Sequence, residues 1–254
     1  ITTTVLDQGA DVRNVFELGL DTSFKAFKVI HERARGGNDV GLRHVVEPRA
    51  EYTYIPEPSV VPENLYQFDS IDRRNELNSI QLGIRNKYQT KRRGRVVDLV
   101  DFDLFTYYRF STLGEQEDFS DIFFDLELRP VRGVFLDLEG GFDPYESTFD
   151  RFDAQVALIA KDRSSLAFEY IHRDDSRDVI TGDLRLLPGR PVGYAGYVRY
   201  DFFDSDLEEH SHLLTLKSDC VGWGIGFRET GDELQLWLQV WLTAMPRGNV
   251  ELGR

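Results

Sequence analysis

Several features that identify common protein classes are missing from this sequence. It holds a single cysteine, Cys220, so no disulfide bond can form within its 254 residues. No run of about 18 apolar residues occurs, which excludes a membrane-spanning helix but not a membrane-spanning sheet. The first residue is Ile1 and no apolar signal segment follows it, so we interpret the chain as a mature or trimmed piece of a longer protein.

Motifs for catalysis and for cofactor or metal binding are also missing. The chain has no Gly-x-Ser-x-Gly motif, no Walker-type phosphate loop and no zinc-ligand spacing. Positive charge is scarce, because 30 Lys and Arg residues stand against 44 Asp and Glu residues, giving a net charge of -14. Such a chain repels nucleic-acid phosphates. We therefore expect no enzyme activity, no cofactor, no metal and no nucleic-acid partner.

The sequence does contain a clear alternation of apolar and polar residues. Hydrophobic residues make up 41% of the chain, enough for a folded protein, and they recur with a period of two rather than a helical period. This pattern predicts an all-β, antiparallel fold of about 13 strands, many of about 10 residues or more, whereas soluble strands usually have about 5 to 6. Tilted strands that cross a bilayer need about 9 to 11 residues, so the lengths favour a transmembrane β-barrel. The predicted strands are 16–30, 42–55, 79–89, 96–111, 121–129, 132–143, 152–161, 166–173, 179–187, 193–203, 210–219, 221–228 and 233–243.

The predicted connections alternate in character along the chain. Compact turns, several of them rich in Arg or Lys, alternate with longer acidic segments such as 56–76, 112–119 and 143–148. Short turns at one edge of the sheet and long loops at the other are typical of outer-membrane barrels. A soluble meander has no reason to sort its connections in this way.

The segment "RHVVEPRAEYTYIPE", which begins at Arg43, shows what kind of strand is present. Glu47, Arg49 and Glu51 fall on one face, and aromatic and aliphatic residues fall on the other. A strand whose apolar face contacts lipid, and whose other face meets a hydrated lumen, carries such charges in mid-membrane at little cost. Pro48 has no backbone N–H, so we expect a bulge or a locally open register at this position.

Charged residues recur on the same face of consecutive predicted strands, and we predict that they form a wall facing the lumen. Paired carboxylates could serve glycoside hydrolysis. However, arginines accompany these acids on strand after strand, and a hydrated charged wall explains that mixture better. The predicted wall comprises Glu47, Arg49, Glu51, Arg85, Asp101, Asp103, Arg109, Asp125, Glu127, Asp137, Glu139 and Arg151.

Three blocks of the sequence resemble one known family. They are "GLRHVVEPRAEYTYIPE", "FDSIDRRNELNSIQLGIRNKYQTK" and, near the end of the chain, "LKSDCVGWGIGFRE". In this order they are similar to the C-terminal barrel domain of the lipopolysaccharide-assembly protein family LptD, also known as the organic-solvent-tolerance family. The blocks cover roughly the first third and the last sixth of the chain, and the strands between them match in pattern only.

The resemblance implies a larger assembly in the outer membrane. Residues 1–254 would form one partial barrel domain, the C-terminal half of a barrel of about 26 strands, with the N-terminal strands and a periplasmic domain absent. An open sheet in lipid leaves unpaired backbone groups at its edges, which agrees with a missing half. The family's function is to insert lipopolysaccharide into the outer leaflet. The implied partners are lipopolysaccharide, an LptE-like plug lipoprotein, a periplasmic lipopolysaccharide bridge protein reached through the N-terminal domain, and membrane lipid.

Cys220 has two interpretations. It stands where the family carries its C-terminal cysteine or cysteine pair, so the resemblance implies a disulfide bond to the N-terminal domain. The alternative is a buried or free thiol. His210 and His212, two apart on a predicted strand, could bind a metal with a third ligand, or could simply belong to a polar loop end at the outer edge.

The last predicted strand is a candidate lateral seam. Its seam residues are Leu234, Leu236, Trp237, Leu238, Val240 and Trp241. A two-residue Thr230–Gly231 turn would place Gly224 opposite Trp237. The two tryptophans either pack over bare glycine backbone or form an apolar patch for acyl chains or the plug.

Two alternative functions are also compatible with the sequence. A substrate-specific porin-like channel would share the barrel architecture but would need neither a plug nor a seam. A soluble β-sandwich binding protein would share the alternation but would bury its apolar faces between two layers.

Overall fold

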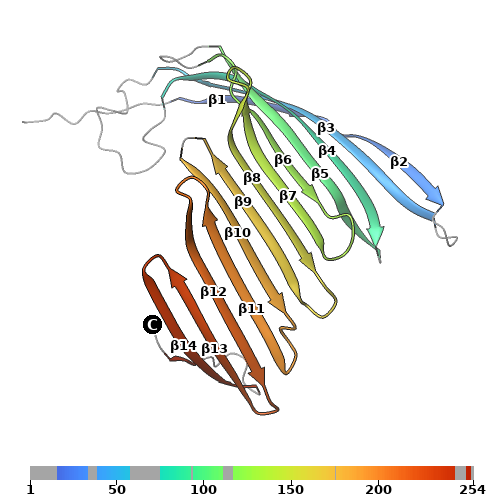
Figure 1. Cartoon of the computed structure of the whole chain (residues 1–254). Helices are drawn as coiled ribbons and strands as arrows, with labels where there is room; N and C mark the ends of the chain where they lie inside the picture. The colour runs from blue at the N-terminus through green and yellow to red at the C-terminus, as the bar shows by residue number, and fades with distance from the viewer. Residues whose placement is uncertain are drawn as a thin grey trace, which may run out of the picture. The chain divides into compact units, whose positions relative to one another are not determined.

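The computed structural model describes residues 16–33, 39–57, 75–92, 94–110, 117–174, 176–243 and 250–252. All regular secondary structure in these segments is β-strand, and the strands form one antiparallel sheet (Figure 1). No helix in these ranges is long and apolar enough to cross a membrane. The strands are β1 Leu18–Ser23, β2 Ala26–Arg33, β3 Asp39–Ile55, β4 Leu77–Arg92, β5 Arg95–Arg109, β6 Ile122–Leu128, β7 Val134–Asp143, β8 Thr148–Ile159, β9 Ser165–Arg173, β10 Arg177–Leu186, β11 Val192–Asp201, β12 Asp206–Lys217, β13 Val221–Thr230, β14 Glu233–Leu242 and β15 Val250–Leu252.

The strand order follows the sequence. From β3 to β15 each strand pairs with the next, and β1 and β2 both pair with β3. β1 and β2 together correspond to the first predicted strand, and each of β3 to β14 corresponds to one of the other predicted strands. The predicted strands are therefore confirmed, and β15 is an additional strand of three residues. Within the described segments β1 pairs with neither β14 nor β15, so the sheet is not closed. The all-β antiparallel prediction is confirmed, and the sheet is consistent with a β-barrel-type fold.

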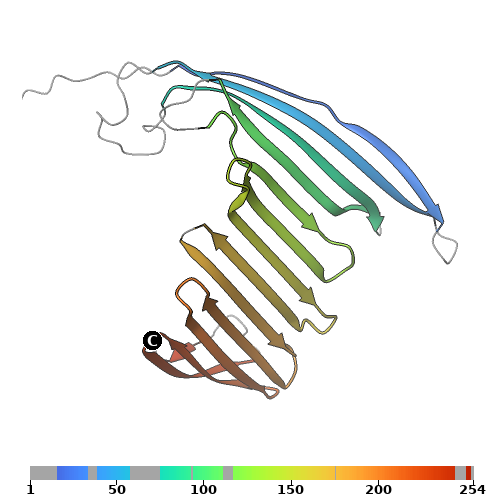
Figure 2. The ribbon, with the colours of Figure 1, turned by 45° about the horizontal axis from the view of Figure 1, so that its top comes forward.

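The chain divides into two compact units. The first comprises Ile1–Ala26, Val46–Ile84 and Phe105–Asp121, and the second comprises Phe27–Val45, Arg85–Leu104 and Ile122–Arg254. In the second unit, strands β6 to β14 lie side by side in sequence order (Figures 1 and 2).

In the first unit, Pro48 interrupts the pairing of its neighbour as predicted. The register pairs Ser23 of β1 with Arg49 of β3, so Phe24 lies opposite Pro48. Pro48 has no N–H to donate, and its carbonyl accepts one hydrogen bond from Phe24 N at 3.3 Å. The ladder therefore stops at Ser23 and resumes only with β2.

The predicted asymmetry of loop length holds for only part of the chain. Long connections join β3 to β4 and β5 to β6, but the other connections at that edge are as short as the opposite turns. Ser147 and Ser205 adopt positive φ values of 58° and 55°, which close the connections 144–147 and 202–205 within a few residues. The strands on either side therefore extend further than expected. The shortened connections are 144–147, 174–176 and 202–205, against opposite turns at 129–133, 160–164 and 187–191.

The predicted register of the C-terminal hairpin is wrong by two residues. The turn consists of Gly231 and Asp232, because Thr230 pairs with Glu233. Gly231 has a φ of +55°, which suits the first central position of a type II′ turn, whereas the predicted turn would have put the β-branched Thr230 there. A shift of two residues keeps every side chain on its face.

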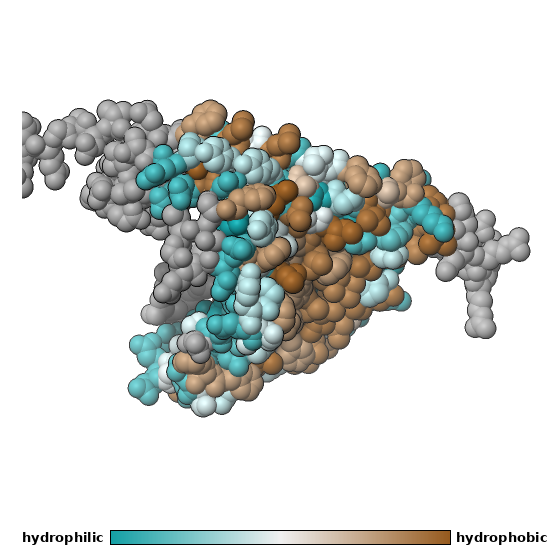
Figure 3. Space-filling view, turned by 90° about the horizontal axis from the view of Figure 1, so that it is seen from above, coloured by the Kyte–Doolittle hydropathy of each residue, from teal (hydrophilic) through white to brown (hydrophobic). Residues whose placement is uncertain are grey.

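The apolar face of the sheet is exposed rather than packed. Among the described residues only two hydrophobic side chains, Ile55 and Val179, are buried, whereas Ile225 is 62% exposed and Leu236 76% exposed. In Figure 3, brown apolar side chains gather over a broad area of the surface. A β-sandwich would bury these residues between two layers, so this arrangement counts against the soluble alternative.

Candidate functional site

The charged wall, defined as the twelve residues predicted to face the lumen, lies along the face opposite the exposed apolar side chains. In the second unit, Asp125 lies directly opposite Glu139, and Glu127 lies opposite Asp137. Directly opposite residues of an antiparallel pair share a face. Alternation along the strands thus gathers charges from several strands on one surface.

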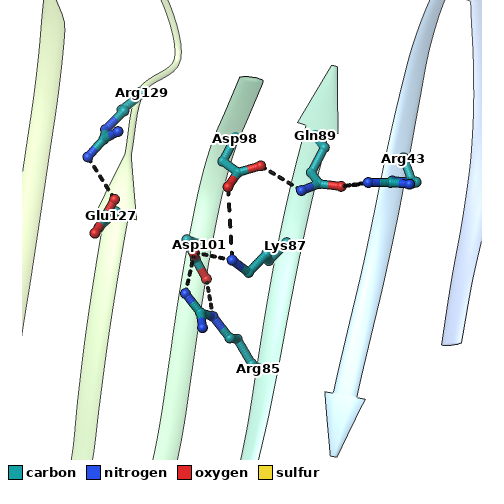
Figure 4. Close-up of polar contacts among 8 residues, drawn as sticks. All are labelled: Arg43, Arg85, Lys87, Gln89, Asp98, Asp101, Glu127 and Arg129. Atoms are coloured by element: carbon teal, nitrogen blue, oxygen red, sulfur yellow. Dashed lines mark hydrogen bonds and ion pairs between the residues drawn. The ribbon is translucent and has the colours of Figure 1, made fainter. Parts of the chain in front are cut away.

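One part of the wall is an ion-pair cluster on β4 and β5 (Figure 4). Arg85 donates two hydrogen bonds to the carboxylate of Asp101, at 2.8 and 2.7 Å, and Lys87 Nζ lies 2.8 Å from the same carboxylate. The Asp101 side chain is only 10% exposed. Burial makes a lone carboxylate costly, and two cations with charge-assisted hydrogen bonds offset that cost.

Asp98 joins this cluster although the sequence analysis did not select it. Its carboxylate lies 3.9 Å from Lys87 Nζ and accepts a hydrogen bond from Gln89 Nε2 at 2.6 Å. Arg43 in turn donates to Gln89 Oε1 at 2.7 Å (Figure 4). A regular strand points residues three apart to opposite faces, so the convergence of Asp98 and Asp101 on one lysine could not follow from alternation. Lys87, Gln89 and Arg43 are an even number of residues from wall members on their strands. The period of two therefore places them on the wall face, and the sequence could have predicted them.

A second part of the wall is mainly acidic. A hollow of about 350 Å³ is lined by six acidic residues from β6 to β9. Oδ1 of Asp137 is buried there, with no hydrogen-bond partner in the described part of the chain. Directly opposed carboxylates repel each other, so this hollow attracts cations and repels anions. The six residues are Asp125, Glu127, Asp137, Glu139, Asp153 and Glu169.

Arginines border this acidic hollow. Arg173 makes a bidentate contact with Asp153, at 2.6 and 2.7 Å. Arg151 lies 3.9 Å from Glu139, and its guanidinium stands 5.1 Å from the centre of the Phe123 ring. Arg129 contacts Glu127 at 2.8 Å. Asp153 and Arg173 were missed by the sequence analysis, although both sit at alternating wall positions.

In the first unit, the wall residues have separate partners. Glu47 lies 3.3 Å from Lys25 Nζ, and Arg109 donates to the Glu117 carbonyl at 3.0 Å. Arg49 crosses the backbone of Gly83 to reach the ring of Phe105, 5.5 Å from its guanidinium carbon. Glu51 is exposed and pairs in register with Asp21. The remaining predicted member, Asp103, belongs to the second unit and lies on β5 two residues from Asp101.

The two histidines lie on the apolar face, within β12, rather than in a polar loop end. His210 is opposite Glu229 and His212 is opposite Phe227, whose ring centre is 4.8 Å away. Tyr194 Oη hydrogen-bonds with Nδ1 of His212 at 2.5 Å. No group of three metal-ligating side chains in the described segments includes either histidine. The loop-end prediction is wrong because β12 starts at Asp206, four residues before the expected start.

Cys220 is exposed in the turn between β12 and β13, and its thiol is free. Thr243 anchors this turn to the end of β14, because its N–H donates to the Cys220 carbonyl at 3.0 Å and its hydroxyl donates to the Asp219 carbonyl at 2.5 Å. A disulfide to another domain remains a prediction, and an exposed turn leaves the sulfur accessible to a partner.

The seam strand β14 is not the last strand. Its residues Leu238, Gln239 and Val240 pair with β15. On the wall face, Trp241 lies opposite Gly222 and Trp237 lies opposite Gly226. A Cβ atom on Gly222 would overlap the Trp241 indole, so the rings pack on bare glycine backbone.

Comparison with known proteins identifies the family of this chain. The model of the family described as "LptD: LPS transport system D" matches residues 11–186, which includes two of the three resembling blocks and the strands that follow them as far as β10. The third block lies beyond the matched range. No curated protein matches the chain. The family match covers well over half of the sequence, and the chain therefore belongs to the LptD family, a component of lipopolysaccharide transport in the outer membrane.

Proposed function

We propose that this sheet forms part of the wall of an outer-membrane translocon that inserts lipopolysaccharide into the outer leaflet. The observation that carries the proposal is the inverted distribution of side chains. Apolar residues such as Ile225 and Leu236 are exposed on one face, while Asp101 is buried between its partly exposed cations on the other. A sheet of this kind suits lipid on one side and a hydrated path on the other.

The chemistry of the cargo gives each face a role. Lipopolysaccharide joins sugars, which need water, to acyl chains, whose transfer into an apolar medium gains about 0.8 kcal/mol per CH₂. The charged wall supplies a hydrated surface for the sugars. The acyl chains leave through a lateral seam along β14, whose outer edge is paired with β15 at only three positions in the described part of the chain.

Closure of the barrel requires strands beyond this sheet. Unpaired backbone groups in hydrocarbon cost several kcal/mol each, so we propose that further strands pair with the two edges of the sheet. On this proposal residues 1–254 are the C-terminal half of the barrel. A plug lipoprotein occupies the lumen, and a periplasmic bridge protein delivers lipopolysaccharide to the N-terminal domain.

The test is depletion of the full-length protein in its native host, followed by measurement of lipopolysaccharide at the cell surface. We expect surface lipopolysaccharide to fall and to return when the wild-type protein is supplied. Normal surface lipopolysaccharide after depletion would refute the proposal. If the purified protein then conducts ions with a stable closed seam, the porin-like alternative is the better account.

A further inference from the structure

A pocket separate from the charged wall opens near the short turns of β10 to β14. Its volume is about 430 Å³, within the usual range of roughly 300 to 1,000 Å³ for small-molecule sites. None of the twelve wall residues lines it. The side chains that matter for its chemistry are Arg185, Thr215, Lys217, Gln239, Trp241 and Thr243.

Two glycines of β13 set how the side chains beside this pocket pack. Gly222 pairs with Lys217 on one side and with Trp241 on the other, and Gly224 pairs with Thr215 and Gln239. Because neither glycine carries a side chain, the Trp241 indole lies over the backbone of Gly222, and the Gln239 side chain lies beside Gly224. The Gly-x-Gly alternation of β13 therefore lets the Trp241 ring lie close to the sheet, and the residues that line the pocket come from β10, β11, β12 and β14, with Pro188 and Thr243.

The charges in this pocket are positive. Arg185 Nε lies 3.3 Å from Oδ1 of Asp183, two residues earlier on the same strand, and 61% of the Arg185 side chain is exposed. Lys217 Nζ donates to the Pro188 carbonyl at 2.9 Å. A guanidinium has five N–H donors and an ammonium has three, so both groups keep donors for a ligand. Two cations face one carboxylate, which leaves a positive balance at the mouth.

The remaining lining suits a ring that carries hydroxyl groups. The Trp241 indole offers a flat apolar surface, and Thr215 and Gln239 add a hydroxyl and an amide within the same row of side chains. C–H groups on the face of a sugar ring pack well against an aromatic ring, while the hydroxyl groups at its rim need polar partners. The combination of two cations, one indole and neutral polar groups is the chemistry that recognises a sugar with an acidic substituent.

We propose that this pocket binds an anionic sugar, with its phosphate or carboxylate on Arg185 and Lys217 and its ring against Trp241. The inference rests on the proposed function and deepens it, because it assigns a binding position to the sugar part of the cargo. The acidic hollow on β6 to β9 repels the same ligand. An anionic sugar is therefore held beside the turns of β10 to β14 rather than spread over the whole wall.

The test is a fluorescence titration of the full-length protein in detergent, in a Trp223→Phe, Trp237→Phe background that leaves Trp241 as the reporter within this segment. We expect both glucose 6-phosphate and glucuronate to quench the Trp241 emission saturably. Titrating each sugar separately gives the affinity of the pocket for a phosphate-bearing and for a carboxylate-bearing sugar. The double variant Arg185→Gln, Lys217→Gln should bind at least 10-fold more weakly. Lys161→Gln, in a turn outside the pocket, is the matched control and should bind as the background does.

Each other outcome overturns a defined part of the proposal. Equal binding of uncharged glucose would remove the role of the cations, and equal binding of inorganic phosphate would remove the role of the indole. Unchanged affinity in the double variant, or no quenching by any anionic sugar, would refute the site. None of these results bears on surface delivery of lipopolysaccharide, so the transport proposal and the pocket fail separately.

Discussion

The indole of Trp241 lies across the backbone of Gly222, its partner on the neighbouring strand. The same relationship recurs in the second unit: Trp237 covers Gly226, and Phe124 covers Gly140. In each pair a ring fills the space that a side chain would otherwise occupy. Aromatic cover of a strand glycine restores the packing that the missing side chain would have supplied.

The first prediction concerns this packing. Gly222→Ala should destabilise the protein by about 1 to 3 kcal/mol, because the added methyl group overlaps the Trp241 ring. Thermal unfolding in detergent measures the change. Gly224→Ala is the matched control, since a Cβ there meets Gln239 and Leu213 only at 3.3 Å or more, and it should have a much smaller effect.

A double-mutant cycle separates the overlap with the Trp241 ring from the other effects of alanine at position 222. In a Trp241→Ala background the ring is gone, so Gly222→Ala should lose most of its cost. An equal cost with and without the indole would show that the ring does not determine the need for glycine at position 222.

The second prediction concerns the ion-pair cluster. Asp101→Asn should cost about 2 kcal/mol, because it leaves Arg85 and Lys87 without their shared carboxylate on a half-buried surface. Glu127→Gln, which breaks the more exposed pair with Arg129, should cost less than about 1 kcal/mol. Unfolding at low and high salt gives both values, and equal costs would contradict the special position of Asp101.

The third prediction distinguishes the two faces by their surroundings. Ile225→Arg should reduce stability in bilayers by about 2 to 4 kcal/mol if the exposed apolar face contacts hydrocarbon. In water an exposed position usually tolerates such a change within about 0.5 kcal/mol. Gln155→Arg, on the opposite face beside Asp137 and Glu169, is the control and should be tolerated. Equal tolerance of the two variants in vesicles would contradict lipid contact at Ile225.

The fourth prediction concerns Cys220. In the full-length protein isolated without reductant, we expect the thiol to resist a maleimide reagent until the protein is reduced, because a disulfide to the N-terminal domain occupies it. Cys220→Ser should then change the mobility of the protein on a non-reducing gel. Rapid labelling before reduction would identify a free thiol, for which the exposed turn already provides access.

The face of each strand was predictable because alternation is a local property. Leu234, Leu236, Leu238 and Leu242 lie on the exposed face as the period of two requires, and the twelve predicted wall residues sit at alternating positions of their strands. The register of the last hairpin was not predictable in the same way. A shift of two residues preserves both faces, so the turn has to decide, and the positive φ of Gly231 favours a Gly231–Asp232 turn over one that starts at the β-branched Thr230.

The contacts within the wall depend on neighbours that the sequence does not place. Asp98 lies three residues from Asp101, a spacing that a period of two assigns to opposite faces, so its approach to Lys87 does not follow from alternation. Strand ends were also misplaced. The start of β12 at Asp206 depends on cross-strand hydrogen bonds with β11, and this error put His210 at the end of the predicted strand, beside a polar loop, instead of well within β12.

Ile55 and Val179 are the two buried hydrophobic side chains in the described ranges, so this part of the protein has almost no hydrophobic core of its own. Most of its apolar area is left for the medium to cover. Its melting temperature is therefore expected to vary with acyl-chain length and with the choice of amphiphile, in a way that proteins with an internal core do not share. Stability measured in a single micelle type describes that pairing of protein and surfactant, so variants need to be ranked in several.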